Sequence, residues 1–245
     1  MIRDEIHKEF ISLFDSLSGR YSRYQVWSDF VIMSACAVSN ACDKRYFEKR
    51  EAMYMECASR YTKEEAEKFA KMLALVVLAF DDNPEQDFLG DVFGLLKLNS
   101  EWKGQFFTPY HVAKLMAVIN ARDIRKDVEE KGIVSVNDCC CGAGCLLIAF
   151  ANAVKDEGVN YQQKVLFVAQ DIDLISGLMC YIQLSILGCK AIVKIGNSLS
   201  EPIAEPFVPD ENVWFTPFYM FGNLLSFMDV FSREKDDKSS ADKSA

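Results

Sequence analysis

Apolar residues in the first hundred positions recur at helical spacing. In the first run, Ile6 to Leu17, they fall on one face of a helix that stops before a Ser-Gly pair. Thr62 and Glu65 have the spacing of a capping box, which starts another helix that continues through Leu78. The same patterning predicts helices over 26–41, 44–60 and 87–98. Nothing in this region has catalytic spacing, so we predict a purely helical N-terminal region over residues 1–100.

After residue 99 the pattern changes to alternating helices and strands. A helix is predicted from about His111, decaying into a charged stretch at 122–131. Apolar strands are predicted over 133–137, 165–169, 191–195 and 212–215, with helices over 145–155 and 174–187. Strand–helix–strand repeats of this length favour a parallel sheet with right-handed crossovers. The sequence therefore predicts an α/β domain over 101–231, followed by a polar, disordered tail over 232–245.

The composition and the first residues of the chain indicate where in the cell the protein is expected. No apolar run approaches the ~18–20 residues that a membrane-spanning helix needs. The first residues, MIRDEIHKEF, alternate in charge where a secretory signal would be apolar. We expect a soluble, cytoplasmic protein that contacts no membrane.

The net charge argues against a chain that binds DNA by itself. Thirty-six acidic against 27 basic residues give a net charge of −9, whereas proteins that neutralise phosphates are usually basic. The best basic run, Lys44, Arg45, Lys49 and Arg50, is interrupted by Glu48, and we interpret it as a solvated helix face. If nucleic acid is the substrate, we expect another subunit to make most of the contacts with it.

The cysteines do not form a zinc pattern. There are nine of them, but they include no C-x-x-C pair, and the chain has only two histidines. We expect reduced, mostly buried thiols and no bound metal, with metal binding as a remote alternative.

The strongest local motif is the segment from Asp138 to Gly144, between a predicted strand and a predicted helix. Gly142 and Gly144 let the backbone turn tightly and approach a ligand at the carboxyl end of a parallel strand. Asp171 ends the next strand, where a carboxylate can accept both hydroxyls of a ribose. Together they predict a nucleoside-containing cofactor. The alternative is a glycine-rich packing turn and a surface aspartate.

The details of the turn restrict the cofactor. The third glycine of a dinucleotide fingerprint is missing, and the chain has no G-x-x-x-x-G-K-[ST] motif for a nucleoside triphosphate. Asp138 directly before the turn is poorly placed beside a pyrophosphate but suits a ligand that carries an amino group. S-adenosylmethionine has such a group on its methionine end.

Four segments in order resemble the N6-adenine-specific DNA methyltransferases, in particular the methylation subunit of type I restriction–modification systems. Gly104-Gln105-Phe106-Phe107-Thr108-Pro109 resembles their opening signature, and Asp138–Gly144 resembles their D-P-x-x-G-S-G cofactor loop. Gln170–Asp173 is similar to their ribose-binding acid, and Gly196–Leu199 to the segment after the third strand. The resemblance covers about residues 87–200. It implies a shortened Rossmann-like S-adenosylmethionine-dependent methyltransferase sheet behind the helical region.

The resemblance also implies a set of cofactor contacts. The aromatic ring and the Thr-Pro pair of the first signature would pack around the methionine part, and Asp138 would meet its amino group. Asp171 would hold the ribose, and Asn197 would lie near the adenine. The full set is Phe107, Thr108, Pro109, Asp138, Cys139, Gly142, Gly144, Asp171, Ile172 and Asn197.

One family motif is altered. The [DN]-P-P-[YF] segment of these enzymes holds the target amine and stacks on the extruded base. The comparable stretch here is Thr216-Pro217-Phe218-Tyr219, in which threonine replaces the amide or carboxylate. The resemblance implies that this stretch and Asn197 are catalytic. The alternative is an aromatic cluster, with Trp214, Phe215 and Phe221, that covers a hydrophobic edge.

Three functions follow as hypotheses. The first is methylation of adenine N6 in DNA, with a specificity subunit or other partner supplying sequence choice. The second is an inactive pseudo-methyltransferase that binds cofactor or acts structurally through protein partners. The third is methylation of a small molecule or a protein.

Overall fold

The computed structural model describes residues 2–98, 107–203 and 209–222. Residues Gly104, Gln105 and Phe106 of the first signature lie outside the described residues. The same holds for 223–231 and for the predicted tail at 232–245.

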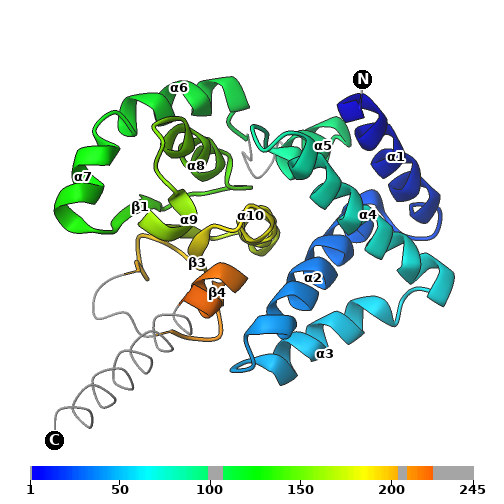
Figure 1. The fold of residues 1–245 in the computed structure, drawn as a ribbon. Helices are drawn as coiled ribbons and strands as arrows, with labels where there is room; N and C mark the ends of the chain where they lie inside the picture. Colours follow the sequence, from blue (N-terminus) through cyan, green and yellow to red (C-terminus); the bar gives the residue numbers. More distant parts are fainter. Residues whose placement is uncertain (1, 99–106, 204–208, 223–245) are drawn as a thin grey trace, which may run out of the picture.

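The helical region forms as the apolar spacing predicts. Its helices are α1 (Ile2–Leu17), α2 (Arg23–Cys42), α3 (Phe47–Ala58), α4 (Lys63–Asp82) and α5 (Phe88–Leu95), gathered on one side of the molecule in Figure 1. Thr62 caps α4 by accepting a hydrogen bond from the Glu65 backbone, and the Glu65 side chain accepts one in return, so the capping box is confirmed. Phe10, Trp27 and Phe30 pack edge to face in the centre of the bundle.

The second half of the chain alternates helices and strands. Its elements are α6 (Tyr110–Asn120), α7 (Ile124–Lys131), β1 (Val134–Asp138), α8 (Cys145–Asp156), α9 (Tyr161–Lys164), β2 (Val165–Asp171), α10 (Leu174–Ile186), β3 (Lys190–Ile195) and β4 (Val213–Phe215). The charged stretch that we predicted as the decaying end of one helix is a separate helix, α7. It ends at Gly132, whose positive φ of 77° allows the chain to turn into β1.

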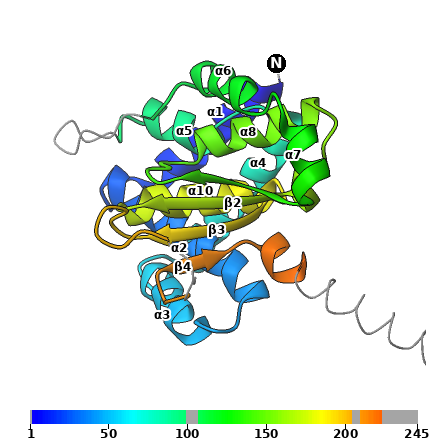
Figure 2. The ribbon, with the colours of Figure 1, turned by 90° about the vertical axis from the view of Figure 1, so that its left-hand side faces the viewer.

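The sheet is mostly parallel, with strand order β1-β2-β3-β4. The first three strands run parallel, as predicted, so their carboxyl ends meet at one end of the sheet. Strand β4 runs antiparallel to β3, with Ile192 opposite Phe215. In Figure 2, β2, β3 and β4 follow one another down the sheet, which leaves β1 and β4 as the two edge strands.

A buried arginine joins the helical region to β4. Arg50 on α3 is 1% exposed and donates hydrogen bonds to the Val213 carbonyl at 2.8 Å and to Ser39 at 2.6 Å. It also pairs with the buried Asp43 at 3.2 Å and lies over the Trp214 ring at 4.3 Å. The interpretation of Arg50 as part of a solvated face is therefore wrong. Its charge is compensated inside the junction between the two halves.

Two further observations concern the described residues. None of their helices is long and apolar enough to cross a membrane, and they contain no cluster of three or more metal-ligating side chains. All nine cysteines are free, and six of them are buried.

Candidate functional site

The turn after β1 is built on two glycines in the left-handed region. Gly142 has a φ of 54° and Gly144 a φ of 97°, and Gly144 leads directly into α8. A Cβ at Gly144 would lie 2.9 Å from the Cys180 sulfur and 3.4 Å from the Cys180 Cα. Both the backbone angle and the contact with α10 therefore require glycine at position 144.

Asp171 holds this turn in place. Its Oδ2 accepts a hydrogen bond from the Gly142 backbone N–H at 2.8 Å, and its Oδ1 accepts one from the Asp173 N–H at 2.9 Å. A carboxylate has about four lone-pair positions, so each oxygen can still accept a second hydrogen bond from a ligand. The side chain is only partly buried. Asp171 can therefore bind two ribose hydroxyls while it supports the turn.

Asp138 presents an unpartnered acceptor next to the turn. Its Oδ1 accepts from the Cys140 backbone N–H at 3.2 Å. Its Oδ2 is buried and has no hydrogen-bond partner among the described residues. Burial, with a contribution from the Asp171 charge, raises the pKa of the Asp138 carboxyl above its usual value. A buried carboxylate oxygen without a donor suits a ligand ammonium group.

The first signature lies against the same turn. A Cβ at Gly142 would come within 3.1 Å of the Phe107 ring, which itself packs edge to face on Phe93 at 5.3 Å. The Cys145 thiol donates to the Thr108 carbonyl at 3.1 Å, and Pro109 immediately precedes α6. The structure therefore brings together two signatures that are some thirty residues apart in the sequence.

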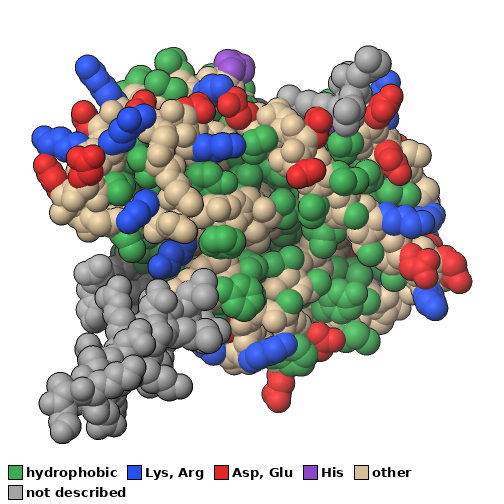
Figure 3. All heavy atoms as spheres, viewed as in Figure 1, with side chains coloured by type: hydrophobic (Ala, Val, Ile, Leu, Met, Phe, Trp, Pro, Cys, Tyr) green, Lys and Arg blue, Asp and Glu red, His purple; other side chains and the backbone are tan. Residues whose placement is uncertain are grey.

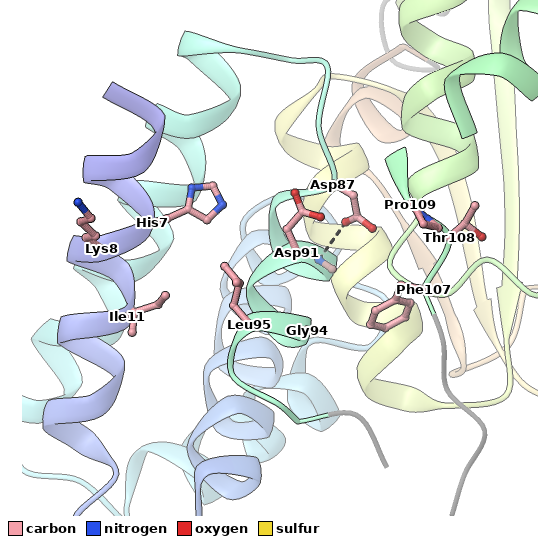
Figure 4. Close-up of a pocket in the computed structure, with 11 residues that line it drawn as sticks. His7, Lys8, Ile11, Asp87, Asp91, Gly94, Leu95, Phe107, Thr108 and Pro109 are labelled. Atoms are coloured by element: carbon pink, nitrogen blue, oxygen red, sulfur yellow. Dashed lines mark hydrogen bonds between the residues drawn. The ribbon is translucent and has the colours of Figure 1, made fainter. Parts of the chain in front are cut away.

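A cavity of about 790 Å³ opens beside this segment (Figure 4). Its walls come from α1, α5 and the Phe107–Pro109 segment, and they include His7, Lys8, Asp87 and Asp91. The volume is in the range of small-molecule sites in proteins. It is large enough for a ligand of nucleoside size.

Asp87 and Gln183 connect this cavity to the turn, and the sequence reasoning did not single them out. Asp87 accepts hydrogen bonds from the Gly90 N–H at 3.0 Å and from Gln183 Nε2 at 2.8 Å. Gln183 Nε2 also donates to the Ala143 carbonyl at 2.8 Å. Burial raises the pKa of Asp87 to about 6. The available signal was Gln183, the one amide side chain in the mostly apolar 174–187 helix.

The segment after β3 lies at the same end of the sheet. The Gly196 N–H donates to the Asp171 carbonyl at 2.9 Å, which places Asn197 near Asp171. Asn197 is exposed, and its Oδ1 accepts from the Leu199 N–H at 2.9 Å. Ile172 is 71% exposed, and Cys139 is also exposed. These three side chains are accessible to a ligand at the carboxyl ends of the strands.

The Thr216–Tyr219 stretch lies at the other end of the sheet. Thr216 is fully buried, and its hydroxyl donates to the Cys189 carbonyl at 2.7 Å and accepts from the Ala191 N–H at 2.9 Å. Cys189 directly precedes β3 and Ala191 lies at its beginning, roughly 17 Å along that strand from Gly196 at ~3.3 Å per residue. The structure does not bring this stretch together with the turn.

The rest of that stretch is part of an aromatic cluster. Tyr219 stacks against Phe215 with ring centroids 4.7 Å apart, and both belong to a small core with Ile192 and Val213. Phe218 is 42% exposed at the same end. The position of the Thr216–Tyr219 stretch agrees with the alternative interpretation from the sequence, an aromatic cluster that covers a hydrophobic edge.

Replacing Thr216 by alanine should therefore reduce stability and leave ligand binding unchanged. The variant leaves the buried Cys189 carbonyl and Ala191 N–H without their partner, which should cost about 1–3 kcal/mol of unfolding free energy. Urea denaturation measures this loss, and Thr216→Ser, which keeps the hydroxyl, is the matched control. A Thr216→Ala variant with unchanged stability but weakened cofactor binding would contradict this assignment.

The fold and the turn define a class of protein. A parallel strand that ends in a glycine turn, a helix that follows it, and an acid at the end of the neighbouring strand are typical of nucleotide-cofactor-binding α/β domains. The family model for the N-6 DNA methylases matches residues 85–219, more than half of the chain, and the chain belongs to this family. No curated protein and no solved structure matches it. The matched region runs from α5 through the turn to β4 and the residues that follow it.

Proposed function

We propose that this chain binds S-adenosylmethionine, the cofactor of its family, at the carboxyl ends of β1 and β2. The observation that carries the proposal is the buried, unpartnered Oδ2 of Asp138, beside a turn that Asp171 holds from the neighbouring strand. Asp138 would receive the ammonium group, and Asp171 would accept the ribose hydroxyls. Phe107, Thr108 and Pro109 would line the methionine part.

The remaining predicted contacts would lie along the adenosine part of the cofactor. Gly142 and Gly144 keep the turn free of side chains, and Ile172 offers an exposed apolar surface for a ring. Asn197 and Cys139 lie exposed near it. When bound, the cofactor supplies a methyl group on a positively charged sulfur. The chain's own contribution is to fix the position of that methyl group.

The proposed reaction is methylation of adenine N6 in DNA, by direct transfer to an extruded base, and the proposed location of the protein is the cytoplasm. A partner, such as a specificity subunit, would hold the DNA. The net charge of −9 supports this proposal, because a surface that binds DNA by itself would be basic. On the face drawn in Figure 3, acidic and basic side chains are mixed.

Transfer of tritium from labelled S-adenosylmethionine to unmethylated DNA tests this function. The chain would be assayed alone and together with the proteins encoded beside it, and N6-methyladenine would be identified in a nuclease digest. We expect transfer only when a partner is present. Transfer to protein instead of DNA would redirect the assignment to another substrate.

A second function is favoured by the position of Thr216. The described residues bring no [DN]-P-P-[YF] segment to the cofactor end of the sheet, since the comparable stretch packs at the other end. The chain could therefore act as a cofactor-binding pseudo-methyltransferase in a larger assembly. Cofactor binding without transfer, in the presence of every co-encoded partner, distinguishes this function from the first.

The affinity for S-adenosylmethionine should fall in acid. The ligand ammonium group binds the ionised form of Asp138, whose pKa is raised in the free protein. Below that pKa the carboxyl must first lose its proton, so affinity should drop by up to about tenfold per pH unit. Calorimetric titrations at several pH values, from neutral pH down towards the usual aspartate pKa of about 4, would show the slope.

Two variants separate this effect from general acid sensitivity. Asp138→Asn should bind more weakly at neutral pH and lose most of the slope. Asp156→Asn, an exposed acid at the end of α8, should keep the wild-type profile. An identical slope in Asp138→Asn would show that another group titrates.

A further inference from the structure

One peptide unit of the turn after β1 lies between two glycines. Ala143 has Gly142 before it and Gly144 after it, and both glycines are in the left-handed region. Because glycine adopts many backbone conformations at similar energy, the Ala143–Gly144 peptide can rotate unless its polar groups are bonded. The Gly144 N–H donates to the Cys141 carbonyl at 2.8 Å, within the same turn. The partner of the Ala143 carbonyl therefore holds this peptide from outside the turn.

That partner is Gln183, a fully buried side chain on α10. Its Nε2 donates to the Ala143 carbonyl and to Asp87 Oδ1, both at 2.8 Å, and its Oε1 accepts from the Leu89 N–H at 3.0 Å. The two acceptors and the one donor fix which end of the amide carries the nitrogen. Gln183 therefore uses both amide hydrogens and joins the turn to the start of α5.

The two acceptors around Gln183 require an amide. They need two hydrogens on one atom, whereas a carboxyl in the same place carries at most one hydrogen and an apolar side chain carries none that can be donated. Asp87 is 2% exposed and Ala143 is 1% exposed, so water does not replace a lost donor. The side chain at position 183 therefore decides whether the Ala143 carbonyl is bonded.

Gln183 and Asp171 hold neighbouring peptides of the turn from two different elements. Asp171, at the end of β2, accepts from the Gly142 N–H at 2.8 Å, and Gln183 on α10 donates to the next residue, Ala143. One element supplies an acceptor and the other supplies a donor. Loss of either contact releases a different peptide of the turn.

We propose that Gln183 is a positioning residue for the cofactor. It lies buried behind the turn and acts through Ala143, by keeping the flanking glycines at the backbone angles that leave the turn open to a ligand. With the same nitrogen it bonds Asp87, so it also fixes the turn relative to the cavity wall that α5 supplies (Figure 4). This role rests on the proposed function, since it concerns the binding of S-adenosylmethionine at this turn.

Calorimetric titration of Gln183→Glu with S-adenosylmethionine tests this role. The introduced carboxyl can donate to Asp87 or to the Ala143 carbonyl, but not to both. With the turn less well held, the affinity should fall at least about tenfold. The same substitution lowers stability, so a second variant has to separate the two effects.

Combining Gln183→Glu with Asp87→Asn provides that separation. The amide introduced at position 87 donates to the carboxylate introduced at position 183, which restores a bond between α5 and α10 with donor and acceptor exchanged. The Ala143 carbonyl is still left without its amide donor. We expect the urea midpoint to return towards the wild-type value while the affinity stays reduced.

Asn152→Asp is the matched control for an acid that replaces a buried amide. Asn152 on α8 is 6% exposed, and its Nδ2 donates to Pro84, Tyr110 and Ile148 rather than to the turn. This variant should lower the urea midpoint and keep the affinity for S-adenosylmethionine within a few fold of the wild type.

Hydrogen exchange measured by NMR without cofactor reports on the peptide itself. Relative to the amides of β2, the Gly144 amide should exchange faster in both variants that carry Gln183→Glu. The same ratio should keep its wild-type value in Asn152→Asp. A change confined to the Gln183 variants is not expected if the side chain only stabilises the fold.

Each contrary result has its own meaning. Wild-type affinity in Gln183→Glu overturns the inference, and so does an affinity that recovers together with stability in the double variant. An unchanged exchange ratio at Gly144 overturns the assignment of the Ala143 peptide as the group that Gln183 positions. Absence of binding by the wild-type chain overturns the proposed function and this role together, which is distinct from a wild type and variants that all bind equally well.

Discussion

Replacing Arg50 by methionine should lower the unfolding free energy by about 3 kcal/mol. The loss has four sources. The Val213 carbonyl and the Ser39 hydroxyl lose their donor, Asp43 loses one of its cations, and Trp214 loses the guanidinium over its ring. All these groups are buried, so water does not replace the lost contacts. Because Arg50 connects α3 to β4, the antiparallel edge of the sheet should loosen first.

Arg45→Met is the matched control for this prediction. Arg45 also pairs with Asp43, at 2.8 Å, but it is 41% exposed, so its removal should cost about 1 kcal/mol or less. Urea denaturation of both variants gives the comparison, and hydrogen exchange locates the loosened strand. Equal stabilities of the two variants would contradict the assignment of Arg50 as the buried link between the two halves.

Asp171→Ala should reduce the affinity for S-adenosylmethionine at least about a hundredfold, or roughly 2.7 kcal/mol. The substitution removes the acceptor for the ribose and also the partner of the Gly142 N–H, so the turn loses its support from β2. Isothermal titration calorimetry measures the affinity. Asp171→Asn, which retains one carbonyl oxygen, should fall between the wild type and the alanine variant.

Asp173→Ala controls for damage to the neighbouring helix. Asp173 caps α10 by accepting from the Ser176 N–H at 2.9 Å, and its loss should cost about 1 kcal/mol of stability. It should leave cofactor affinity within a few fold of the wild type. If Asp171→Ala bound the cofactor with wild-type affinity, Asp171 would not be part of the cofactor site.

The sequence predicted what depends on local chemistry. Apolar spacing located the helices, and the Thr62–Glu65 pair predicted a cap that the structure contains. The glycines at 142 and 144, and the acid at 171, were found because a tight turn and a strand end impose residue types over short stretches. The structure shows these residues in contact, although their role towards a cofactor stays a prediction.

What depends on tertiary partners was not predicted. Apolar residues at 213–215 indicate a strand but not its direction or its neighbours. In the structure β4 pairs antiparallel with β3, and its Val213 carbonyl accepts a hydrogen bond from Arg50. Thr216 resembled part of a motif, yet its place in the fold is set by β3 backbone groups. Arg50 looked solvated because its partners, Asp43 and the Val213 carbonyl, lie on other elements.

Titration of the wild-type chain with S-adenosylmethionine by calorimetry tests the central claim most directly. We expect binding at one site per chain with micromolar affinity, weakened in Asp138→Asn and unaffected in Thr216→Ala. Absence of binding heat at high protein concentration, confirmed by equilibrium dialysis with labelled cofactor, would contradict it. The turn between β1 and α8 would then be a packing turn, and Asp138 and Asp171 would serve the fold alone.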